Sequence, residues 1–166
     1  MQIPRGSTVF SCDVCGACRC GSSRDVLAEA AITHLLQRYA RLLDAGELTA
    51  VAELFDRADI LVSGTQIGTG SDFVEQLLRD TVIIHADGTP GTRHIVTPRS
   101  FDFEGDGRVT VHSDYTVLQP VLRPGEVVMV GRHHDTLVLD AGGWHFDSRD
   151  YGDITYVGDT SAHLRS

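Results

Sequence analysis

Three side chains of this sequence are suited to proton transfer. Tyr39 and Asp44 lie five residues apart in RYARLLDAGEL, and His94 lies in TRHIV. An imidazole and a carboxylate can together move a proton near neutral pH, and a tyrosine hydroxyl can polarise an oxygen atom. Each residue also has a structural interpretation, with Asp44 as an exposed residue at a helix end and His94 as a hydrogen-bonded core histidine.

The spacing of Tyr39 and Asp44 sets a geometric condition on such a site. Five residues along an unbroken α-helix correspond to a rotation of about 140°, so the two side chains would point in different directions. Local unwinding of the helix before Gly46 could turn Asp44 into a cavity; without it, Asp44 would be an exposed residue at the helix end.

A second set of polar residues lies in the later part of the chain. His133 and Asp135, in RHHDT, should share one face of a strand. Because adjacent histidines of a strand face opposite sides, His133 and His134 are not expected to bind one metal ion. The candidate substrate-binding side chains are those of His133, Asp135, Tyr115 and Arg149. Arg149 can alternatively form a structural ion pair with a nearby acid.

All four cysteines are in CDVCGACRC, as Cys12, Cys15, Cys18 and Cys20. Two overlapping C-x-x-C units could hold zinc or an iron–sulfur centre, but the second pair that a structural zinc site usually has is missing. We expect no metal there and prefer a flexible, reduced tail or a start codon assigned too far upstream. Disulfides are not expected in a reducing cytoplasm.

Composition restricts the class of protein. The chain has 166 residues, of which 42% are hydrophobic and 22% charged, as expected for one globular domain. A net charge of −9 with scattered basic residues argues against a nucleic-acid partner. Neither a signal peptide nor a run of about 18 apolar residues is present, so we expect a cytoplasmic protein without a membrane partner.

Periodicity predicts helices first and long strands afterwards. Apolar residues at three- and four-residue steps indicate a helix from Ser22 or Ser23 to Gly46, and alternation indicates long strands in the second half. The expected elements are helices to Gly46, over 47–55 and over 71–86, and strands over 59–63, 93–103, 108–121, 126–139 and 144–151. This order predicts an α+β domain over 22–152 with tails at 1–21 and 153–166. Helices on one face of a curved antiparallel sheet would form a cone around a small-molecule pocket.

From about Val26 to Tyr151, the chain resembles the SnoaL-like branch of the nuclear transport factor 2-like superfamily. The segments that carry the resemblance are, in order, RYARLLDAGEL with VAELF, then GTG, TRHIVT and GRHHDTLVLDAGGWHFDSR. The resemblance implies a cone-shaped α+β fold that is commonly dimeric, so a homodimer or homo-oligomer is expected. The family includes dehydratases, isomerases and cyclases as well as non-catalytic binding domains.

The resemblance also assigns roles to single residues. Asp44 and His94 match the aspartate and histidine that form an acid/base pair in the dehydratase-like members. Tyr39 matches a tyrosine of the first helix, and Arg149 matches a late arginine. The implied activity is a dehydratase or isomerase without a cofactor, acting on a small hydrophobic hydroxy or carbonyl compound such as a polyketide, steroid or terpenoid.

Two other functions remain open at this point. The chain could be a non-catalytic small-molecule-binding or assembly module of the same fold, in which Asp44 and His94 form only a structural hydrogen bond. It could also be a redox or metal sensor that acts through the cysteine segment. Leu43 and Gln119 stand where scytalone dehydratase has a tyrosine and a histidine, which argues against the specificity of that enzyme.

Overall fold

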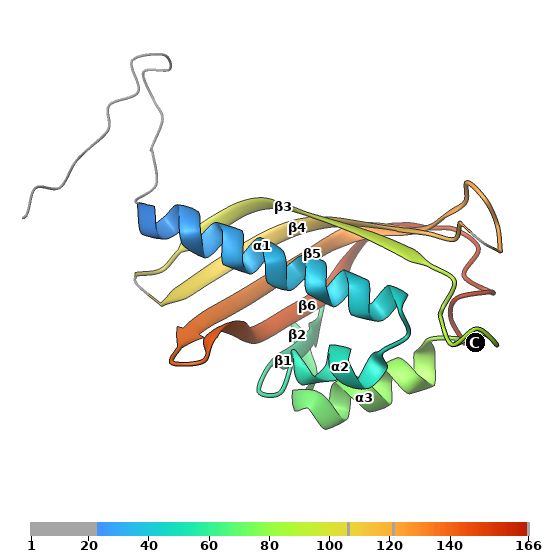
Figure 1. Cartoon of the computed structure of the whole chain (residues 1–166), viewed down its shortest axis with the longest axis horizontal. Coiled ribbons are helices and arrows are strands. Elements are labelled where there is room, and N and C mark those ends of the chain that lie inside the picture. The colour runs from blue at the N-terminus through green and yellow to red at the C-terminus, as the bar shows by residue number, and fades with distance from the viewer. Residues whose placement is uncertain (1–22, 106, 121, 166) are drawn as a thin grey trace, which may run out of the picture.

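The computed structural model describes residues 23–105, 107–120 and 122–165. It confirms an α+β fold in which helices precede a curved sheet, and Figure 1 shows the helices on one face of that sheet. The elements are α1 (Ser23–Asp44), α2 (Leu48–Glu53), β1 (Asp59–Val62), β2 (Thr65–Thr69), α3 (Gly70–Thr81), β3 (Arg93–Phe103), β4 (Arg108–Leu118), β5 (Val127–Asp140) and β6 (Gly143–Val157).

One sheet joins all six strands in the order β2-β1-β6-β5-β4-β3. The four long strands form an antiparallel meander, as their short connections predicted, and β1 joins β6 in parallel. The sheet does not close, so β3 is an edge strand, and α1 lies along this side of the sheet (Figure 1). The start of β3 and the end of α1 are thereby brought close together.

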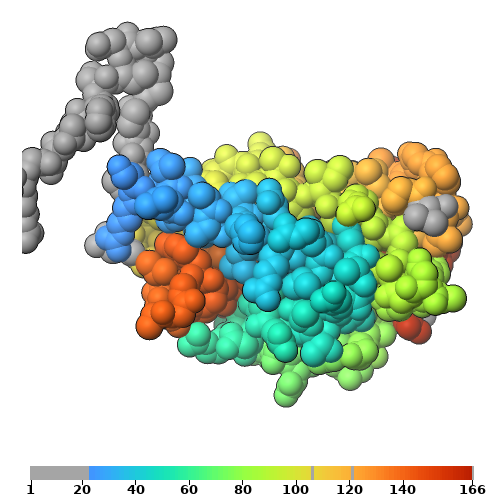
Figure 2. Space-filling model, in the orientation of Figure 1, coloured from blue at the N-terminus to red at the C-terminus, as the bar shows by residue number. Residues whose placement is uncertain are grey.

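Strand alternation puts one face of the sheet against the helices. In β4, the side chains from Val109 to Val117 are alternately buried and partly exposed. The core joins this face to α1 and α2, and Phe55 stacks on Phe146 with 4.5 Å between ring centroids. Burying a large apolar side chain contributes about 1.5–3 kcal/mol, so this packing holds the layers together. Figure 2 shows side chains of the helices covering the centre of this face.

The region between residues 63 and 84 differs from the prediction. Instead of a glycine-rich turn, β2 pairs with β1 through a two-residue turn in which Ser63 and Gly64 have φ values of 50° and 77°. Such a turn suits a tight hairpin. The helix predicted over 71–86 ends at Thr81, and Val82 forms a β-bridge with Leu164.

The end of the chain is also more ordered than its lack of periodicity suggested. β6 continues past residue 152 to Val157, and the following segment folds back against the end of α3. The Ile83 backbone N–H donates to the His163 carbonyl, and that of Arg165 donates to Thr81, both at 2.8 Å. This C-terminal segment, residues 159–165, is therefore attached to the end of α3 and, through the Gln119 side chain, to the residue that follows β4.

The four cysteines lie outside the described residues. None of the described helices is long and apolar enough to cross a membrane.

Candidate functional site

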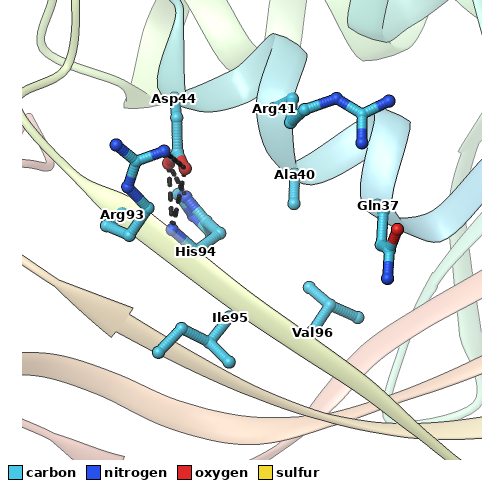
Figure 3. Close-up of a pocket in the computed structure, with 8 residues that line it drawn as sticks. All are labelled: Gln37, Ala40, Arg41, Asp44, Arg93, His94, Ile95 and Val96. Carbon is cyan, nitrogen blue, oxygen red and sulfur yellow. Dashed lines mark hydrogen bonds and ion pairs between the residues drawn. The ribbon is translucent and has the colours of Figure 1, made fainter.

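Asp44 and His94 form a direct contact at the junction of α1 and β3 (Figure 3). His94 Nδ1 lies 2.6 Å from Asp44 Oδ1, and the two side chains are only 7% and 8% exposed. The His94 backbone N–H also donates to both carboxylate oxygens, at 3.0 Å each. A carboxylate only accepts, so in the neutral form of the His94 ring this contact places the hydrogen on Nδ1 and leaves the lone pair on Nε2.

Asp44 reaches His94 without the local unwinding considered before Gly46, and its side chain is not exposed. α1 is helical through Asp44, and the Ala45 backbone N–H still donates to the Arg41 carbonyl at 3.0 Å. The helix instead reaches the start of β3 directly, so its last residue faces His94. A regular helix then directs Tyr39 elsewhere, as the five-residue spacing requires.

A hollow of about 260 Å³ lies beside the pair, between α1 and β3. Ala40 of α1 and Val96 of β3 line its apolar part (Figure 3). Arg93 stands at its rim, with a guanidinium nitrogen 3.8 Å from Asp44 Oδ2 and a largely exposed side chain. This hollow is open to solvent, and Tyr39 is not part of its lining.

Tyr39 belongs to a second polar group, centred on Arg149 and Asp135. Arg149 Nε and Nη2 donate to the two carboxylate oxygens of Asp135 at 2.6 and 2.8 Å, and both side chains are fully buried. The Tyr39 ring lies over the guanidinium, 4.3 Å from its carbon atom. Burial lowers the pKa of Arg149, but the charge and hydrogen bonds of Asp135 outweigh burial and raise it. The structural ion pair considered for Arg149 is therefore present.

His133 and Tyr115 complete this second group. His133 is buried and stacks on Tyr115, with 4.4 Å between ring centroids. Burial, followed by the charges of Arg149 and His94, holds the pKa of His133 well below its usual value, so the ring is neutral. Burial likewise raises the pKa of Tyr39, which keeps its hydroxyl hydrogen.

Six buried side-chain atoms of the described residues have no hydrogen-bond partner, and they fall into two sets. The first is Ser113 Oγ, His133 Nδ1 and Arg149 Nη1, and the second is Thr92 Oγ1, Gln119 Oε1 and His163 Nδ1. Ser113 faces His133 across β4 and β5, whereas the Gln119 side chain donates to the Ala162 carbonyl. Buried polar atoms are nearly always hydrogen-bonded, so both sets are places where a polar ligand atom would be stabilised.

The structure thus divides the predicted site residues between two neighbouring groups. Asp44 and His94 form one, and the other candidates surround the Arg149 ion pair. His163 is the residue that sequence reasoning missed, because its segment has no periodicity that would place it near His94. Within the described ranges, no three His, Cys, Asp or Glu side chains are grouped so that they could hold a metal ion.

Comparison with known proteins assigns the chain to a family. Residues 24–150 match the SnoaL-like domain. No curated protein matches the chain.

Several solved structures have the same fold at low sequence identity. A putative scytalone dehydratase from Novosphingobium aromaticivorans is 20% identical, with 76% of this chain and 84% of that chain covered and a TM-score of 0.61. An NTF2-like protein with a cystatin-like fold from the same species is 21% identical, with 84% and 88% covered and a TM-score of 0.62. A hexachlorocyclohexane dehydrochlorinase, LinA-type3, from Novosphingobium barchaimii is 17% identical, with 81% and 91% covered and a TM-score of 0.62.

Proposed function

The chain belongs to the SnoaL-like family, and we propose that it is a cofactor-independent acid/base enzyme of the dehydratase or isomerase type. Its substrate would be a small hydrophobic hydroxy or carbonyl compound, such as a polyketide, steroid or terpenoid. The observation that supports this proposal best is the 2.6 Å contact between His94 Nδ1 and Asp44 Oδ1 in a nearly buried pair. Similar folds include a putative scytalone dehydratase and a dehydrochlorinase, both named for eliminations.

His94 is the proposed base. Asp44 holds the hydrogen on Nδ1, so the lone pair of Nε2 is available to take a proton from the carbon next to a substrate carbonyl. The resulting imidazolium lies beside the Asp44 carboxylate, which offsets its charge. Loss of this base should lower the rate about 10²–10⁴-fold.

The second polar group is suited to hold the carbonyl oxygen. Removing the proton leaves negative charge on that oxygen, and donors aimed at developing charge stabilise it strongly in a dry site. Arg149 Nη1 is buried and unpartnered, the Tyr39 ring lies against the same guanidinium, and the Tyr39 hydroxyl keeps its hydrogen. Asp135 already balances the charge of Arg149, so an uncharged ketone fits this site better than a carboxylate does.

The proton on Nε2 then leaves by one of two routes. In a dehydration, it passes to the departing β-hydroxyl group, the carbon–oxygen bond breaks and water leaves with a new carbon–carbon double bond behind it. In an isomerisation, it returns to the γ-carbon of the same enolate. Neither route consumes an oxidant or a reductant.

Proton exchange tests the common first step directly. The full chain is incubated in D₂O with a panel of β-hydroxy ketones and unsaturated ketones, and loss of the α-proton signal is followed by NMR. We expect exchange by the wild-type protein and a roughly 10²–10⁴-fold slower rate for His94→Gln. Exchange that survives unchanged in His94→Gln would exclude His94 as the base.

One observation favours a non-catalytic binding module as the second candidate. Asp44 also accepts the His94 backbone N–H, which attaches β3 to α1 whether or not a reaction occurs. A module of this kind would bind lipophilic ketones saturably in a calorimetric titration, without α-proton exchange for any member of the panel. His34→Phe, an exposed site on α1, is the matched histidine control and should leave both binding and exchange unchanged.

A further inference from the structure

His163 lies next to His94 although the two are far apart in the sequence. Their ring centroids are 6.1 Å apart, with an angle of 62° between the ring planes. The His163 side chain belongs to a residue that is only 5% exposed, and its Nδ1 has no hydrogen-bond partner. The ring therefore presents a buried polar atom that nothing in the proposed reaction has used.

Two further unpartnered atoms belong to the same end of the sheet. Thr92 precedes β3 and Gln119 follows β4, directly beyond the facing pair of Arg93 and Leu118. Thr92 Oγ1 and Gln119 Oε1 are both buried without a partner. Gln119 also donates to the Ala162 carbonyl at 3.2 Å, so it is attached to the segment that carries His163.

We propose that Thr92, Gln119 and His163 form a second polar subsite, which binds an uncharged hydroxyl group of the ligand beside His94. The inference rests on the proposed function for the identity of the ligand and deepens it. A ligand that binds both the Arg149 group and this subsite would carry two oxygen functions, one on each side of the carbon that faces His94. A β-hydroxy ketone has this arrangement, whereas a simple unsaturated ketone lacks the second oxygen.

The chemistry of the three side chains selects a neutral group. A hydroxyl, an amide and an imidazole carry no net charge, and a hydroxyl ligand can both donate to and accept from them. Burial holds the pKa of His163 at about 4, so the ring is neutral at physiological pH. An anion would find no positive charge here, which distinguishes this subsite from a carboxylate or phosphate site.

The C-terminal segment positions His163 through contacts that do not involve its ring. Its backbone is bonded to Thr81 and Ile83, and His85 Nε2 donates to the Ala162 carbonyl at 3.0 Å. A variant of His85 therefore disturbs the segment without removing the proposed hydrogen-bonding ring. This difference supplies a control for an indirect effect.

The test compares two probes of the same shape, 2-naphthol and 2-methylnaphthalene, which differ by one hydroxyl group. Their dissociation constants are measured by calorimetry with the full chain, and the ratio of the two constants is the hydroxyl selectivity. We expect the wild type to prefer 2-naphthol and His163→Phe to lose roughly two- to tenfold of this selectivity, the range for one hydrogen bond. His163→Gln, which keeps a donor and an acceptor, should retain part of the preference.

Two controls separate direct from indirect effects. His34→Phe should keep the wild-type selectivity, and His85→Gln should reduce it less than His163→Phe does. Equal affinity of the wild type for both probes, or an unchanged selectivity in His163→Phe, would overturn the subsite. A loss in His85→Gln as large as that in His163→Phe would also overturn it, because placement of the segment would then explain the effect.

This experiment and the proton-exchange experiment fail independently. Selectivity that depends on His163 in a protein without α-proton exchange would support the subsite and refute the proposed reaction. Exchange that depends on His94, with selectivity independent of His163, would refute the subsite and leave the reaction in place.

Discussion

Burial of a neutral histidine makes the stability of this protein depend on pH in a way that one substitution can isolate. The pKa of His163 is lowered from 6.5 to about 4, first by burial and then by the neighbouring His94. Between these two values the unfolded chain binds a proton that the folded chain does not bind. Above about pH 6.5, the neutral His163 ring therefore does not lower the free energy of unfolding. As the pH falls from 6.5 towards 4, protonation of His163 in the unfolded chain lowers the free energy of unfolding progressively.

The size of this effect follows from the two pKa values of His163. Linkage between proton binding and unfolding predicts a loss of about 2–3 kcal/mol between pH 7.5 and pH 4.5 from this one ring. His163→Gln removes the titrating group and keeps its polarity. Over the same pH interval, the free energy of unfolding should then fall by about 2–3 kcal/mol less in the variant than in the wild type.

Urea unfolding of both proteins at half-unit pH steps measures this difference. The titrating groups that do not interact with His163 contribute equally in the two proteins, so their contributions cancel in the comparison. NMR of the histidine ring protons provides an independent check, because the His163 signal should not titrate above pH 5. Parallel stability curves, or a His163 ring that titrates near 6.5, would refute the buried position from which this reasoning starts.

Three further results are expected. In urea unfolding, Asp135→Asn should lower the free energy of unfolding by about 3–5 kcal/mol, because Arg149 stays buried without its counter-charge. The double variant Asp135→Leu with Arg149→Met should recover most of that loss. Gly131→Ala should lower the free energy of unfolding by about 1–3 kcal/mol, because a Cβ there would lie 2.6 Å from both the Tyr115 hydroxyl and a backbone oxygen of β6. Adding Tyr115→Phe should relieve only part of this loss. An unchanged melting temperature of Gly131→Ala would contradict the packing. Tyr39→Phe should slow α-proton exchange about 10²-fold with little change in ketone affinity, and an equal rate would remove Tyr39 from the mechanism.

The fold was accessible from sequence where periodicity was long and regular. The first helix and the four long strands follow from apolar spacing, and His133 and Asp135 share the buried face as alternation predicted. β2 was hidden because glycines at 64, 68 and 70 indicate a turn more strongly than its few alternating residues indicate a strand. Periodicity describes one element at a time, so short elements between turns give little signal.

The candidate site was predictable in residue type but not in grouping. Spacing along the first helix already implied that Tyr39 and Asp44 diverge, and the structure places them in different groups because the helix stays regular. The position of His163 depends on backbone bonds between the C-terminal segment and the end of α3. Contacts between distant, irregular segments leave no local pattern, so no periodicity could have placed His163 beside His94.

Asp44 holds His94 in two ways, through the ring nitrogen and through the backbone N–H. The carboxylate satisfies a backbone N–H on the open edge of the sheet as well as the ring nitrogen. A relative with the same pair but no catalytic activity would still lose stability if either residue were replaced, because its edge strand would no longer be hydrogen-bonded to the helix. Presence of the pair in another member is therefore evidence of shared architecture, and a surviving reaction has to be demonstrated separately.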